Sequence, residues 1–73
     1  MPTVFAEEVA QRVRVRLTLQ RRTQSDLAGR LGLSQAGVSR RLAGQVEFTV
    51  SELATVAAFL DVPMAELLPE AVA

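Results

Sequence analysis

Residues 23–42 read TQSDLAGRLGLSQAGVSRRL, and this stretch decides the fold of the chain. Thr23 followed three residues later by Asp26 is typical of a capped helix start, in which each side chain accepts a hydrogen bond from the other residue's backbone amide. Gly32 is expected to end that helix, because glycine readily adopts the left-handed conformation that follows a helix. Ser34 is a good cap for a second helix. The stretch therefore predicts two short helices joined by a three-residue turn.

The spacing within this stretch has a physical reason at each place. Ala28 lies where the two helices would cross at close range, so its side chain must be small. Four larger apolar residues would point inward and join both helices to the rest of the chain: Leu27, Leu31, Val38 and Leu42. The outward positions of the second helix would then be Gln35, Ala36, Ser39 and Arg40, with Gly37 near the helix start. From Gln24 to Leu42 this is the spacing of a helix-turn-helix, which places its second helix in the major groove of DNA.

A longer helix is predicted before this motif, beginning after a cap at Thr3. Four apolar residues recur every four positions and are expected to face the core: Phe5, Val9, Val13 and Leu17. A second, shorter apolar stripe on another side comprises Val4, Val15 and Leu19. This second stripe would meet either the C-terminal segment or a second subunit.

Two further helices are predicted after Gly44. Thr49 and Glu52 form a capping box, and an apolar side follows that comprises Leu53, Val56, Ala57 and Leu60. Pro63 suits the first position of a fifth helix. No alternating run of β-branched residues suggests a strand. The sequence therefore predicts an all-α fold of five helices, as one domain over residues 1–73.

Composition limits the possible functions of the 73-residue chain, which has no Cys, no His and no Tyr. These absences leave no disulfide, no ordinary zinc ligands and no nucleophile–base pair, so we expect neither an enzyme nor a metal or cofactor site. No apolar run approaches the roughly 18 residues of a membrane span, and no signal pattern occurs, which favours a cytoplasmic protein. We also expect no small-molecule substrate. If so small a core needs support, a second subunit is its expected source.

The charges are segregated along the chain although the net charge is zero. Residues 9–46 hold all eight arginines and one acid, which gives +7, whereas residues 47–73 hold five acids and no base. A concentrated basic region is what neutralising DNA phosphates requires, whatever the total charge. The charge pattern therefore also favours a double-stranded DNA partner.

Several segments together resemble the Cro/C1-type helix-turn-helix family, which includes phage repressors and Cro proteins. TQSDLA at residues 23–28 is similar to the opening of that family's scaffold helix, and LGLSQAGVSR at residues 31–40 is similar to its turn and recognition helix. Residues 53–60 and 64–68 are similar to its closing helices. The resemblance covers roughly residues 9–68 and implies a compact five-helix, lambda-repressor-like DNA-binding domain.

The resemblance also implies roles for single residues. The residues that would read bases are Gln35, Ala36, Ser39 and Arg40. The residues that would contact phosphates are Gln24, Thr23, Ser34, Arg21, Arg22 and Arg41. Thr23 and Ser34 would act through the helix N-termini that they begin.

Three residues depart from the family's pattern. Arg22 stands where an apolar residue is usual before the scaffold helix, and Asp61 replaces the usual glycine between the last two helices. Arg41 stands where the family buries Ile or Leu, so its stem is expected to lie on the core with its guanidinium outward. The phosphate contact predicted for Arg41 therefore competes with a place for its side chain on the core.

The leading hypothesis is a transcriptional regulator, a Cro-like or short repressor of phage or prophage type, that binds operator DNA. The resemblance implies a homodimer that binds a palindromic DNA site, with half-sites roughly 34 Å apart. Four apolar residues near the C-terminus would either form the dimer surface or cap the core of a monomer: Met64, Leu67, Leu68 and Val72. The alternative is a protein-interaction module, such as an antitoxin or an adaptor, that presents its acidic segment 47–73 to a partner.

Overall fold

The described part of the chain, residues 3–69 of the computed structural model, is helical and contains no strand. Its elements in order are α1 (Val4–Leu19), α2 (Gln24–Leu31), α3 (Gln35–Leu42), α4 (Val50–Leu60) and the 3-10 turn η1 (Met64–Leu67). The predicted all-α fold is confirmed. The fifth predicted helix is only this single 3-10 turn, preceded by Pro63 in extended conformation.

Each α-helix begins at a capping side chain. The four caps are Thr3, Thr23, Ser34 and Thr49, and each hydroxyl accepts a hydrogen bond from the backbone amide three residues further along. Both predicted capping boxes are complete, since Asp26 and Glu52 accept hydrogen bonds from the amides of Thr23 and Thr49. The start of every α-helix was therefore readable from local sequence.

The four α-helices also end alike, because each is followed within two residues by one with positive φ: Arg21, Gly32, Gly44 and Asp61. In each case the next amide donates a hydrogen bond to the carbonyl five residues before it. This arrangement satisfies carbonyls at the end of a helix that otherwise lack a donor. The predicted left-handed corner at Gly32 is confirmed, with φ of 68°.

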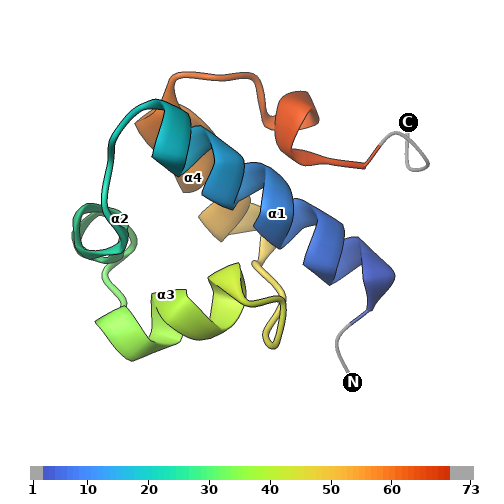
Figure 1. Ribbon diagram of the computed structural model, residues 1–73, viewed down its shortest axis with the longest axis horizontal. Coiled ribbons are helices and arrows are strands. Elements are labelled where there is room, and N and C mark those ends of the chain that lie inside the picture. Colours follow the sequence, from blue (N-terminus) through green and yellow to red (C-terminus); the bar gives the residue numbers. More distant parts are fainter. Residues whose placement is uncertain (1–2, 70–73) are drawn as a thin grey trace.

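The core lies where all five elements meet. In Figure 1, α1 crosses in front of α4, while α3 runs along the lower edge and η1 lies near the upper right. The buried apolar side chains come from every element and include Val9, Val13, Leu27, Val38, Leu42, Val56, Leu60 and Leu67. One prediction for α1 is wrong, because Phe5 lies near the free start of the helix and is 37% exposed.

The residues that follow α4 close this core. Leu67 is fully buried, and Met64 and Leu68 pack against the core, so these residues cap it within one chain. Val72, also predicted here, lies outside the described residues. The stripe of Val4, Val15 and Leu19 stays exposed, so η1 does not cover it. None of the helices between residues 3 and 69 is long and apolar enough to cross a membrane.

Candidate nucleic-acid interface

The two helices of the predicted motif, α2 and α3, pack against each other and hold the candidate interface. Ala28 is 6% exposed, as expected for a close helix crossing, and Leu27 and Val38 are fully buried. Leu42 is 2% exposed at the far end of α3. The inner side of α3 is therefore fixed over its whole length, and its opposite side faces away from the protein.

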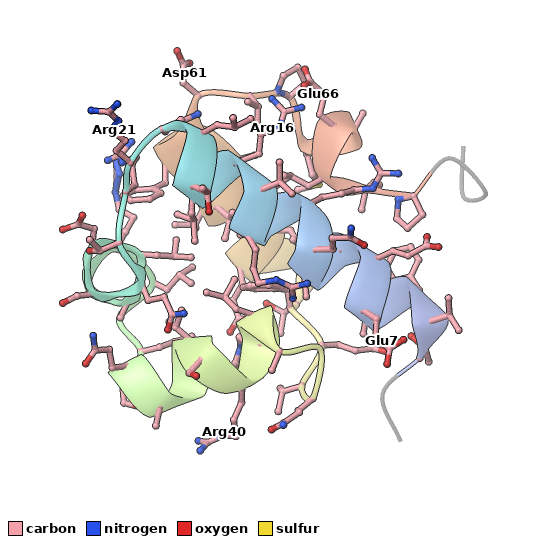
Figure 2. All side chains as sticks on the ribbon, viewed as in Figure 1. Glu7, Arg16, Arg21, Arg40, Asp61 and Glu66 are labelled. Carbon is pink, nitrogen blue, oxygen red and sulfur yellow. The ribbon has the colours of Figure 1, made fainter. Side chains whose placement is uncertain are left out.

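The outward side of α3 carries the residues predicted to read bases. Gln35, Ala36, Ser39 and Arg40 are all exposed, and Arg40 projects from the lower edge of the molecule in Figure 2. Gly37, which was placed beside them, is buried instead, because it faces Ser34 and the side chain of Arg41. Among residues 3–69 the side chain of Arg40 has no ion-pair partner. The structure thus gathers four exposed side chains on one helix face, with their polar groups free for a ligand.

The N-termini of α2 and α3 supply backbone donors beside this face. The hydroxyls of Thr23 and Ser34 are occupied by amides of their own helices. The first two backbone amides of a helix capped in this way have no acceptor within the helix. In α2 they belong to Gln24 and Ser25, and in α3 they belong to Gln35 and Ala36. Groups of this kind favour anions. Within the described chain no hydrogen bond joins the side chains of Gln24 and Gln35, so both amides remain available to a ligand.

Two arginines predicted to contact phosphates have partners within the protein. The Arg22 guanidinium donates to the Phe59 carbonyl at 2.6 Å and lies 3.7 Å from the centre of the Phe59 ring. It therefore fastens the turn before α2 to the end of α4. Arg41 pairs with Glu52 at 3.0 Å. Both guanidinium groups therefore hold helices together, and phosphate contacts by Arg22 and Arg41 stay predictions that these partners argue against.

Two further arginines, neither of them assigned to DNA, also have partners. Arg14 of α1 donates to the Leu42 carbonyl at the end of α3, and Arg16 pairs with Glu66 of η1. Figure 2 shows the second pair near the top of the molecule, far from Arg40. Half of the eight arginines are thus committed to the fold, and the basic middle of the sequence is not a uniform basic surface.

Arg21 is exposed but lies apart from the outward face of α3. It follows the end of α1 in a left-handed conformation, with φ of 56°, which is unfavourable for a residue other than glycine. Figure 2 shows Arg21 at the upper left and Arg40 at the lower edge. A duplex lying on α3 would have to extend past α2 to reach Arg21, so we place it outside the centre of the candidate interface.

Two carboxylates, one in the motif and one at the start of α4, are held in their ionised form. The hydrogen bonds from the side chain and backbone of Thr23 lower the pKa of Asp26, which is fully exposed. At Glu52, burial opposes ionisation most strongly, but the hydrogen bonds from Arg41 and from the Thr49 amide, with the Arg41 charge, hold its pKa below the ordinary value. Both acids therefore stabilise helix starts as anions. The Glu52 partner of Arg41 was missed from sequence, although an arginine at a usually buried position signals that an acceptor lies nearby.

The comparisons with known proteins agree with this geometry. The family model Helix-turn-helix (HTH_3) matches residues 11–67, most of the chain. The chain belongs to the helix-turn-helix family. This confirms the resemblance on which the sequence-based prediction of a Cro/C1-type fold rested. No curated protein sequence matches the chain significantly.

Two solved structures resemble this helix-turn-helix protein closely. The restriction-modification controller protein C.AhdI from Aeromonas hydrophila superposes with a TM-score of 0.79 at 27% identity, over 86% of this chain and 96% of that one. The hypothetical transcription factor NHTF from Neisseria superposes with a TM-score of 0.80 at 25% identity, over 89% of this chain and 75% of that one. Together with the family, they support a DNA-binding transcriptional regulator.

Proposed function

We propose that this helix-turn-helix protein binds a specific operator sequence by placing the outward face of α3 in the major groove of DNA. One observation carries the proposal: α3 is fixed along its inner side and presents an exposed set of side chains, with no partner among the described residues, along its outer side. A rigid helix with free polar groups is what direct readout of base edges requires.

The chemistry of these side chains suggests what they read. The Gln35 amide suits a bidentate contact with adenine, and the Arg40 guanidinium suits the two acceptors of guanine. Ala36 offers a methyl group to thymine, and the Ser39 hydroxyl accepts or donates. Gln24 and the free amides at the starts of α2 and α3 would hold the neighbouring phosphates, which position the helix without reading sequence.

We further propose that two copies bind a palindrome, with their α3 helices about 34 Å apart, and that occupancy of the operator represses transcription. The exposed stripe of Val4, Val15 and Leu19 supports a second subunit, because no described segment of the chain covers it. The Cro-like repressor remains the proposed class. The controller C.AhdI and the factor NHTF, by their names, are also regulators.

The test begins with selection of bound duplexes from a random pool, followed by titration of the wild type onto the selected and random duplexes at several salt concentrations. Each neutralised phosphate contributes a log–log slope of about −0.9. Because half of the arginines have partners within the protein, we expect a shallow dependence of affinity on salt. We also expect a clear preference for the selected duplex over the random one. Affinity that is undetectable, or equal for both duplexes, would refute operator binding and favour the protein-interaction module.

A further inference from the structure

The guanidinium of Arg41 joins three parts of the molecule. Its Nε and Nη2 atoms donate to the two carboxylate oxygens of Glu52, at 3.0 and 3.3 Å. Its Nη1 atom donates to the Gly37 carbonyl, one turn earlier in α3, at 3.0 Å. The Glu52 carboxylate accepts in turn from the Thr49 amide at the start of α4. A continuous polar chain therefore runs from the first turn of α3 to the first turn of α4.

This chain of contacts lies on the inner side of α3, away from the base-reading face. The side chains of Arg41 and Glu52 are only 17% and 18% exposed. A fork-shaped contact between guanidinium and carboxylate fixes direction as well as distance, unlike a contact between point charges. The pair therefore resists both rotation and sliding of α3 relative to α4.

Gly37 leaves the space that this arrangement needs. A Cβ atom at residue 37 would lie 3.3 Å from the Ser34 Oγ and 3.7 Å from the Arg41 Nη1. The first contact is tighter than usual, so a larger residue there would press on the cap of α3 and crowd the guanidinium. Residue 37 directly follows two of the base-reading residues, Gln35 and Ala36. The polar chain thus ends beside the part of α3 that enters the groove first.

We propose that Arg41 and Glu52 are positioning residues that set the orientation of α3, so that sequence discrimination depends on a pair that does not touch DNA. The inference rests on the proposed function. The role of Arg41 is then the opposite of a phosphate contact. Loss of its guanidinium misaligns the base-reading side chains but removes no charge from the protein surface that faces DNA. Misplacement therefore weakens the operator complex, which needs aligned side chains, more than the complex with random DNA.

The test compares Arg41→Met, Glu52→Gln and the double variant with the wild type. Methionine keeps an unbranched stem of similar length, and glutamine at the third helical position keeps the capping box, so both variants should fold. Arg16→Met and Glu66→Gln provide the matched control, because they make the same chemical changes in the ion pair between α1 and η1. The free energy of unfolding of each variant is measured beside its dissociation constants for operator and random duplexes.

We expect each single change in the Arg41–Glu52 pair to lower the preference for operator over random DNA by about tenfold, and the double variant to lose no more, because all three break one interaction. The control pair should leave the preference unchanged. The salt slope of Arg41→Met on random DNA should equal that of the wild type.

Two results would overturn the positioning role while leaving operator binding intact. If the log–log salt slope of Arg41→Met were shallower than that of the wild type by about 0.9 on both duplexes, Arg41 would be a phosphate ligand. An unchanged preference in both Arg41→Met and Glu52→Gln would show that the pair only stabilises the fold. A wild type without any preference would instead overturn the proposed function and, with it, the inference.

Discussion

Two neighbouring arginines on α3 show how differently the two sides of this helix are used. Arg40 is exposed, points away from the protein and has no ion-pair partner in the described chain. Arg41, the next residue, is mostly buried and is bound by Glu52 and the Gly37 carbonyl. A rotation of about 100° per residue along a helix is enough to separate a candidate ligand contact from a structural one. Charge in the sequence therefore overstates the charge available to DNA.

The inner side of α3 should give the largest effect on stability. Leu42→Ala removes a side chain that is 2% exposed and leaves a cavity, so the free energy of unfolding should fall by about 2–5 kcal/mol. Ser39→Ala on the outer side is the control, with an expected change within about 0.5 kcal/mol. Thermal or urea unfolding followed by circular dichroism measures both. Similar losses in the two variants would contradict the assignment of sides.

The turn between α1 and α2 should give a smaller effect of opposite sign. Arg21→Gly relieves a left-handed conformation at φ of 56°, so the free energy of unfolding should rise by up to about 1 kcal/mol. Arg21→Ala removes the same charge without that relief and should not stabilise the fold. Because Arg21 lies apart from α3, both variants should weaken operator binding less than Arg40→Ala does. If the Arg21 variants lost more affinity for the operator than Arg40→Ala, the interface would have to lie closer to α1 than proposed.

The smallest predicted effect is a dependence of stability on acid pH. The lowered pKa of Glu52 means that the folded state binds fewer protons than the unfolded state near its ordinary value of 4.5. The stabilisation is therefore complete above that pH and is lost as the pH falls through 4.5 and towards the lower folded value. The lowered pKa of Asp26 acts in the same direction, as the pH falls through the ordinary value of 3.8. Urea unfolding between pH 7 and pH 3 should show a shallower decline in Glu52→Gln than in the wild type, and equal declines would contradict the role of the pair.

Local chemistry explains which parts of the fold could be predicted from sequence. The caps at Thr3, Thr23, Ser34 and Thr49 and the corner at Gly32 depend on residues within a few positions of each other, so their signals are complete in the sequence. The helical period likewise predicted the buried side of the motif. The exposed Phe5 and the short η1 depend on where neighbouring elements end, which the period alone does not show.

The candidate site was predicted less completely, because several of its residues are defined by distant partners. Arg41 and Glu52 are 11 residues apart, and Arg22 and Phe59 are 37 apart, so no local pattern revealed either contact. Sequence reasoning found the helix that presents Gln35 and Arg40 and ordered its outward residues. It did not separate arginines that support that helix from arginines that remain free, and it placed the buried Gly37 on the outer face.

The central claim is that the outward face of α3 reads base sequence, and the preference for operator over random DNA tests it most directly. Gln35→Ala and Arg40→Ala should each weaken the operator complex by roughly 1–3 kcal/mol with little effect on random DNA. Arg30→Ala removes a charge that is also exposed but lies near Phe59 of α4, and it should leave the preference unchanged. Equal losses on both duplexes for Gln35→Ala and Arg40→Ala, or no loss on either, would contradict the claim.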